Sequence, residues 1–230
     1  MIQLEPEESA AAPRRRRKEA RPAELIEAAI EVFAERGFAA ARLEDVARRA
    51  GVSKGTAYLY FPNKEALFKA AVAEVVVTRI EMGERDVQDW QGCSSELLRH
   101  MLEHWAQVIT SPQGCLLKLI VAEDKNFPEL AAWHHTEVAE RGQRLLAAVL
   151  ARGVARGEFR PVDVEAMAAV IAAPMAFRSI WKHSLGRFET MPVADERFFA
   201  AYFDLMLAGL RPDTVHSTSS KARHEGAANG

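Results

Sequence analysis

The stretch from residue 43 to residue 61 constrains the fold more than any other part of this chain. It contains two short helical patterns separated by the tight turn Gly51-Val52-Ser53. Glycine can adopt the positive φ with which a chain leaves a helix abruptly, and serine is a good N-cap for the helix that follows. The first pattern also carries the small and apolar side chains that two crossing helices need for close packing. The stretch therefore predicts a helix-turn-helix.

The second helix of this motif, expected from Ser53 to about Phe61, offers polar side chains within two turns. Such a helix fits the major groove of B-DNA with its N-terminal residues nearest the base edges, and its free N–H groups favour a nearby phosphate. The alternative is that the run Tyr58–Phe61 is a core stripe. Four consecutive residues cannot all face one side of a helix, so some of them must be exposed.

Residues 22–68, above all the segment AGVSKGTAYLYFPNKEALF, resemble the DNA-binding domain of the TetR family of bacterial regulators. The resemblance implies an all-α fold: an N-terminal three-helix helix-turn-helix DNA-binding domain and a larger helical ligand-binding and dimerisation domain. It also implies a sequence-specific transcriptional regulator, by family expectation a repressor, that is not an enzyme and needs no cofactor. Phosphate contacts would position the domain, and a few base contacts would specify the site.

One departure from the family pattern concerns the residues just before the second helix. Ala41-Arg42 stands where relatives commonly carry Ser or Thr, and arginine is a poor N-cap that costs about 1 kcal/mol. Its charge could still reach a phosphate, and Leu59 likewise replaces a polar residue. By the resemblance, Lys54, Gly55, Thr56 and Tyr58 would meet bases or adjacent phosphates, and Tyr60 and Lys64 would hold the DNA backbone. Together with Ser53 and Arg42, they form the expected DNA-binding set.

Helix signals recur along the rest of the chain, and no run of period-two alternation supports a strand. Pro174 inside one expected helix predicts a kink. We expect a disordered basic arm over 1–20, the DNA-binding domain over 21–68, the effector-binding and dimerisation domain over 69–211 and a disordered tail over 212–230. The expected helices span about 22–36, 43–50, 54–61, 64 onward, 95–109, 114–124, 128–153, 164–184 and 195–210.

Charge is distributed unevenly between the two ends of the chain. Residues 14–64 carry 12 Lys and Arg against 7 Asp and Glu, whereas the remainder carries 18 against 25. A polyanion-binding face is therefore expected near the front. The run Arg14–Lys18 either follows the DNA or is a solvated tag. No apolar run of membrane-spanning length and no secretory signal is visible, and two cysteines cannot form a disulfide framework, so we expect a cytoplasmic protein without a membrane partner.

The last two expected helices are apolar on more than one face, so each needs its own core and a partner. The resemblance implies that they pair with a second subunit as a four-helix bundle. Such a homodimer presents its recognition helices roughly 34–36 Å apart, which predicts a near-palindromic operator. A pocket for a small, largely apolar effector is also implied, although core packing explains the same large side chains. Its candidate lining residues are Met101, Trp105, Leu117, Phe127, Trp133, Met175, Phe177 and Trp181.

A rival interpretation rests on the segment His100-Met-Leu-Glu-His104, which matches the H-x-x-E-H pattern of inverted zinc peptidases. Histidines at i and i+4 can bind one metal, and Glu103 could act as general base. The chain would then be a metal-dependent hydrolase, or a metal-responsive regulator that adds His134 or His135. The helix pattern places these side chains on a polar face, and no third ligand stands out downstream.

Overall fold

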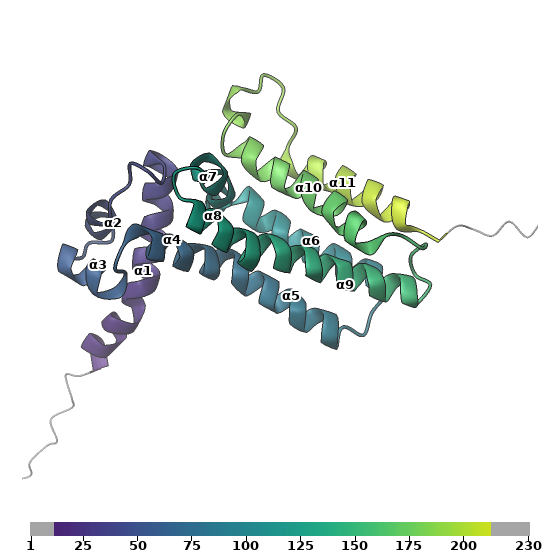
Figure 1. The fold of residues 1–230 in the computed structure, drawn as a ribbon, viewed down its shortest axis with the longest axis horizontal. Coiled ribbons are helices and arrows are strands. Elements are labelled where there is room, and N and C mark those ends of the chain that lie inside the picture. The colour runs from purple at the N-terminus through teal and green to yellow at the C-terminus, as the bar shows by residue number, and fades with distance from the viewer. Residues whose placement is uncertain (1–11, 213–230) are drawn as a thin grey trace, which may run out of the picture.

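The computed structural model describes residues 12–212, with side chains from Arg21 onward, and this part of the chain is all-α without a strand. Figure 1 shows a small group of helices at one end and a longer bundle beside it. Residues 1–11 and 213–230, which hold the start of the expected arm and nearly all of the expected tail, lie outside the described residues. The α-helices are α1 Ala12–Arg36, α2 Leu43–Arg49, α3 Lys54–Tyr60, α4 Lys64–Val72, α5 Thr78–Asp89, α6 Ser94–Thr110, α7 Cys115–Glu123, α8 Pro128–His134, α9 Arg141–Ala155, α10 Val164–Lys182 and α11 Asp195–Leu210.

Helix α1 begins ten residues earlier than the sequence pattern predicted. Pro22, which was expected to be its first residue, lies inside the helix. Residues 12–20, expected in a disordered arm, are therefore helical. Pro13 falls in the first turn, where a missing N–H does no harm, and the Arg and Lys residues after it have high helix propensity. The helix ends at Arg36, as predicted, and Gly37 follows with a φ of +76°.

Two pairs of helices are joined without a loop by short π-helical segments. The segment Ala73–Val77 links α4 to α5, and the segment His135–Glu140 links α8 to α9. The second arrangement confirms the single long helix expected over 128–153. The two π segments contact each other, and such insertions occur frequently at functional sites.

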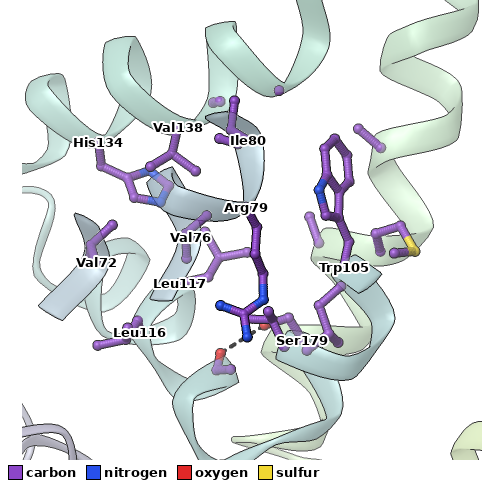
Figure 2. A pocket seen from close by; sticks show the side chains of 18 of the residues that line it. Val72, Val76, Arg79, Ile80, Trp105, Leu116, Leu117, His134, Val138 and Ser179 are labelled. Carbon is purple, nitrogen blue, oxygen red and sulfur yellow. Dashed lines mark hydrogen bonds between the residues drawn. The ribbon is translucent and has the colours of Figure 1, made fainter. Parts of the chain in front are cut away.

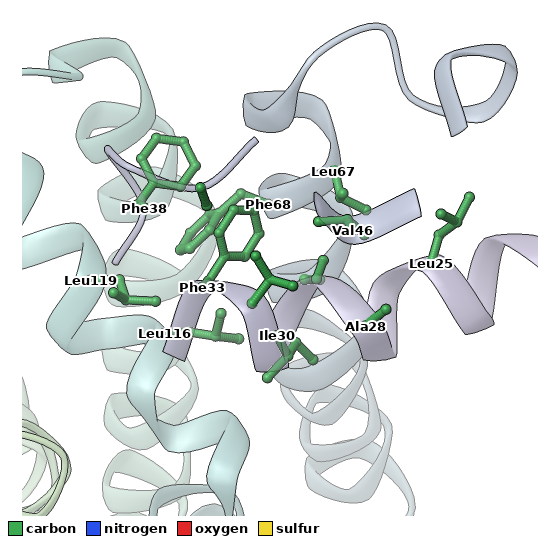
Figure 3. Packing of buried hydrophobic residues seen from close by; sticks show 14 of the residues in the cluster. Leu25, Ala28, Ile30, Phe33, Phe38, Val46, Leu67, Phe68, Leu116 and Leu119 are labelled. Carbon is green, nitrogen blue, oxygen red and sulfur yellow. The ribbon is translucent and has the colours of Figure 1, made fainter. Parts of the chain in front are cut away.

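The first hydrophobic core lies beneath the helix-turn-helix but is not confined to it. Phe33 of α1, Phe38 of the loop after it and Phe68 of α4 pack together with tilted or edge-to-face rings, whose centroids are 5.1 to 5.4 Å apart. Figure 3 shows Leu116 and Leu119 of α7 beside the end of α1, and both belong to the same buried cluster. The helices of the helix-turn-helix therefore share a core with a helix of the larger domain.

The second core lies within the bundle and joins α5, α6 and α9 to one side of α10 and α11. Ile171 and Met175 of α10 are buried there, whereas Val170 and Phe177 on another side are 64% and 58% exposed. Among the described residues, α10 is the one helix that could cross a membrane by length and composition, a weak criterion that core helices also meet. Near its C-terminal end, Arg178 of α10 forms an ion pair with Asp195 at the start of α11.

Candidate DNA-binding surface and ligand pocket

The turn before α3 forms as the sequence predicted. Gly51 adopts a φ of +66°, and Ser53 caps the helix by accepting a hydrogen bond from the Thr56 N–H, 3.1 Å from its Oγ. The Thr56 hydroxyl lies 2.8 Å from the same Oγ. Ala57 is fully buried and anchors α3 on the first core, so the opposite side of the helix faces outward.

The outward side of α3 carries a small polar cluster that also involves α2. Nζ of Lys54 lies 2.7 Å from a carboxylate oxygen of Glu44, and the Tyr58 hydroxyl donates to the same oxygen at 3.3 Å. The hydrogen bond from Lys54 lowers the pKa of Glu44, and the same contact raises the pKa of Lys54. Both side chains are therefore charged at neutral pH, and the carboxylate holds two expected DNA-contacting groups in place.

The expected DNA-contacting residues of α3 do not all share one environment. Lys54, Gly55 and Tyr58 are exposed, and Leu59 beside them is 75% exposed. Tyr60, in contrast, is half-buried against the first core. The exposed side of α3 is thus formed by Lys54, Gly55, Tyr58 and Leu59, with Thr56 half-buried beside them.

Arg42 and Lys64, two expected DNA contacts that lie outside α3, differ strongly in their surroundings. Arg42 is exposed at the start of α2 and makes no capping hydrogen bond, as its side-chain chemistry predicted. The ammonium of Lys64 instead donates to the carbonyls of Phe38 and Ala39, at 2.9 and 2.8 Å, and approaches a third. It also lies 4.8 Å from the centre of the Phe38 ring. Without DNA, Lys64 therefore holds the loop before α2 and is not directed at a phosphate.

A cavity of about 380 Å³ lies where α5, α6, α7, α9 and α10 meet the two π segments. Figure 2 shows Val76, Trp105, Leu117 and Val138 facing one another around it. Most of its lining is apolar, and Leu116, which packs on α1, forms part of the wall. The cavity therefore adjoins the core of the DNA-binding helices.

Of the eight candidate pocket residues, Trp105, Leu117 and Met175 line the cavity, and the other five lie outside its lining. Met101 is buried in the second core. Phe127, just before α8, meets Phe38 edge to face, and Trp133 of α8 packs against the first core. Phe177 and Trp181 stack on each other on the outer side of α10, with centroids 5.5 Å apart.

Sequence reasoning missed the small residues that create the space. Ala169, Ala172, Ala173 and Ala176 of α10 form one wall, and Gly142 of α9 lies opposite Trp105. The signal was the alanine-rich run of α10, since a cavity forms where side chains are short. The polar residues of the lining were also missed, namely Arg79, Gln113, His134, Gln143 and Ser179.

The sequence offered His134 as a possible metal ligand, but its surroundings lower the pKa of its imidazole. Burial, followed by the nearby charge of His135, lowers the pKa of His134 to about 4. The imidazole is therefore neutral at pH 7, and Arg79 is the permanent charge among the residues that line the cavity.

The zinc interpretation of the helix α6 motif is not supported by the geometry. His100 faces Asp86, with 3.6 Å between the nearest atoms, and His104 Nδ1 lies 2.8 Å from the carbonyl of His100. Glu103 lies 3.9 Å from Arg99 instead of beside a histidine. Within residues 12–212, no three His, Cys, Asp or Glu side chains are grouped so as to hold a metal ion.

Comparisons with known proteins match both parts of the chain. The family model of bacterial regulatory proteins of the tetR family matches residues 25–71, and that of the tetracyclin repressor-like C-terminal domain matches residues 91–187. The fatty acid metabolism regulator protein of Bacillus subtilis (strain 168) is 27% identical over 157 residues, which cover 68% of this chain and 78% of that protein. The uncharacterized HTH-type transcriptional regulator YfiR of the same organism is 30% identical over 155 residues, covering 64% and 71%.

Solved structures show the same architecture. The TetR family transcriptional regulator PfmR from Thermus thermophilus superposes with a TM-score of 0.64 at 26% identity, covering 81% of this chain and 98% of PfmR. The two family models fall on the helix-turn-helix and on the larger domain, respectively. The chain therefore belongs to the TetR family of bacterial regulatory proteins and is a DNA-binding transcriptional regulator.

Proposed function

We propose that the protein is a dimeric repressor that binds a near-palindromic operator in the bacterial cytoplasm and leaves it when a small, largely apolar effector enters the cavity. The observation that carries the proposal is the exposed side of α3, where Lys54 and Tyr58 project outward from a helix anchored by Ala57. Lys54, Gly55, Thr56 and Tyr58 would contact bases or adjacent phosphates, with Ser53 at the helix start.

Lys64 and Tyr60 have a different part in this proposal. Because Lys64 already holds the loop before α2, it supports DNA binding by keeping Arg42 and the start of α2 in place. Tyr60 packs against the core on one side and supports the position of α3. Arg42, exposed and without a capping bond, is the candidate for a phosphate contact outside the recognition helix.

Dimerisation is supported by the apolar side chains left exposed on the last two helices. Val170 and Phe177 of α10 and Leu205 of α11 are between 58% and 76% exposed in the single chain. Tyr202 holds α11 against α10 through a 2.7 Å hydrogen bond to the carbonyl of Ile171. Two such helix pairs brought together by a twofold axis would cover these side chains as a four-helix bundle.

The route from effector to DNA follows two helices that belong to both regions. The cavity is lined by Val72 and Val76, on the helix that continues from α4, and by Leu116 of α7, which packs on α1. An effector that prefers a different placement of either helix would change the separation of the two recognition helices in the dimer. Such a preference is what any ligand needs in order to shift a binding equilibrium.

Retention of sheared genomic DNA from the source organism by immobilised full-length protein tests this proposal. The wild type should retain a few discrete fragments, and Lys54→Met should retain them far less well. Glu35→Gln, on the outer side of α1 and paired with Arg49, serves as a folded control that should retain them normally. Retention of fragments without any preference, or a Lys54→Met variant that behaves as the wild type, would refute the proposed role of α3.

A further inference from the structure

The effector cavity contains a cation that no acidic side chain neutralises. The residues that line it include Arg79 but no aspartate or glutamate. Nη1 of Arg79 donates to the carbonyl of Val75, 2.6 Å away, and no carboxylate of the described residues pairs with the guanidinium. Most of the hydrogen-bonding capacity of this side chain is thus available to a bound molecule.

Two other half-buried arginines of the same domain are neutralised by a carboxylate. Arg141 pairs with Glu84 at 3.0 Å, and Arg178 pairs with Asp195 at 2.6 Å. A charge removed from water is costly unless it is paired, so a half-buried arginine usually has such a partner. Arg152 and Arg160 also lack a carboxylate partner and donate to hydroxyl or carbonyl oxygens of the protein, but Arg79 is the arginine that lines the cavity.

Figure 2 shows the Arg79 side chain reaching from α5 past Leu117 toward Ser179. The hydroxyl of Ser179 is already engaged, since it donates to the carbonyl of Gly114 at 2.8 Å. His134 is neutral at pH 7, as described above, and adds no second charge. A negatively charged group in the cavity would therefore meet one cation, surrounded mainly by apolar walls.

We infer that the effector is an amphiphile whose anionic head pairs with Arg79 and whose apolar body contains about a dozen non-hydrogen atoms. The inference rests on the proposed function, since it takes the cavity to be the effector site. Carboxylates and phosphates bind a guanidinium through two parallel N–H···O bonds. The size follows from the cavity volume of about 380 Å³ and the ~30 Å³ that a water molecule occupies in the liquid. A medium-chain carboxylate, free or as a phosphate-bearing thioester, has this chemistry.

Calorimetric titration of the purified full-length protein tests the choice of head group directly. Decanoate, decanol and decylamine share one chain and differ in charge, so they are suitable probes. Decanoate should bind about tenfold or more tightly than the other two, because a charge-assisted hydrogen bond replaces a neutral or repulsive contact. Decanol or decylamine binding as tightly as decanoate, or no binding of decanoate at all, would overturn the inference.

Substitution of the arginine provides the second measurement. Arg79→Met should lower the affinity for decanoate by about tenfold or more and leave that for decanol nearly unchanged. Arg85→Met, which removes an exposed cation from the same helix, is the matched control and should change neither. Arg79→Lys keeps the charge but loses the planar fork, so intermediate affinity is expected. Equal affinities of Arg79→Met and Arg85→Met for decanoate would contradict the inference, and thermal unfolding midpoints verify that each variant is folded.

Two further comparisons separate the possible sources of the anion. If decanoyl-coenzyme A binds more tightly than decanoate and loses this advantage in Arg79→Met, the anionic head belongs to a phosphate-bearing carrier. If decanoate binds more tightly than decanoyl-coenzyme A, the head is a free carboxylate. Both results agree with an effector that has an anionic head. The titrations contain no DNA, so their failure would leave the proposed regulator untouched, whereas loss of specific DNA retention with intact decanoate binding would refute the regulator alone.

Discussion

Lys54 and Glu44 face each other across the helix-turn-helix, with 2.7 Å between the ammonium and the carboxylate. The lysine belongs to α3 and the glutamate to α2, so the pair ties the recognition helix to the helix that supports it. Glu44 also accepts from Tyr58. DNA phosphates must therefore compete with Glu44 for the groups that are expected to contact them.

The variant Glu44→Gln should bind DNA more tightly than the wild type. Removal of the carboxylate releases Lys54 and reduces repulsion of phosphates, which should raise the affinity roughly two- to fivefold at low salt, the range for an exposed ion pair. Fluorescence anisotropy on selected and on scrambled duplexes measures this. The gain should appear on both and shrink as salt rises. Glu35→Gln, which removes an equal charge elsewhere in the domain, should change the affinity for DNA little. An equal gain in affinity from this variant would show that only the net charge matters.

The variant Lys64→Met should destabilise the fold, since the ammonium of Lys64 satisfies carbonyls of the loop before α2. Loss of these charge-assisted bonds should lower the free energy of unfolding by about 1–3 kcal/mol. Urea denaturation followed by circular dichroism is the measurement. Lys54→Met should weaken DNA binding but lower the free energy of unfolding by less than about 1 kcal/mol, because its ion pair with Glu44 is exposed. A Lys64→Met protein that is fully stable and merely binds DNA less well would assign Lys64 to a phosphate after all.

His134 should make the stability of the protein depend on pH. Its pKa is lowered to about 4 in the folded state, whereas an unfolded histidine titrates near 6.5. The unfolded chain therefore binds the proton first, and stability should fall as pH decreases from about 6.5 to 4, by about 2–3 kcal/mol in total. Compared with wild type, His134→Leu should show a shallower slope in this window. His135→Leu, at the exposed neighbour, should retain most of the slope, because burial is the main cause of the shift; equal slopes in wild type and His134→Leu would contradict the assignment.

An acidic residue on the outer side of the last helices should separate the subunits. Leu205 is 76% exposed on α11, and Leu205→Asp would place a charge inside the proposed four-helix bundle. Light scattering should report a dimer for the wild type and a 25.5 kDa monomer for the variant. Met82→Asp alters a residue that is 47% exposed on α5 and should remain dimeric. A wild-type monomer, or a dimer in both variants, would argue against this interface.

The helix-turn-helix was predictable almost residue by residue because its signals are local. Gly51 needs its positive φ, Ser53 caps α3 as expected, and both requirements are visible in the sequence. The start of α1 was not predicted, because Pro13 and Pro22 both suit a first turn and local preference does not choose between them. The role of Lys64 was also missed, since the carbonyls that it binds lie some 25 residues away in sequence.

The pocket was the least predictable feature, for a physical reason. Large side chains such as Phe127 and Trp133 were expected to line it, but large side chains fill space and therefore became core. The cavity opens where Ala172 and Gly142 leave room, and it involves contacts between helices that are distant in sequence. In the sequence, Arg79 is one of many charged residues in a helical pattern and does not stand out. Its proposed role in anion binding follows from the structure, because no carboxylate of the described residues pairs with it.

The most direct test of the central claim is selection of bound sequences from a pool of random duplexes by the full-length protein. The account predicts enrichment of an inverted repeat whose half-sites are centred about one helical turn, 10–10.5 base pairs, or a multiple of it apart. Thr56→Val should change the preferred bases within each half-site without changing their spacing. No enriched sequence, or an enriched sequence that is indifferent to Lys54→Met and Thr56→Val, would contradict the assignment of α3 as the element that reads DNA.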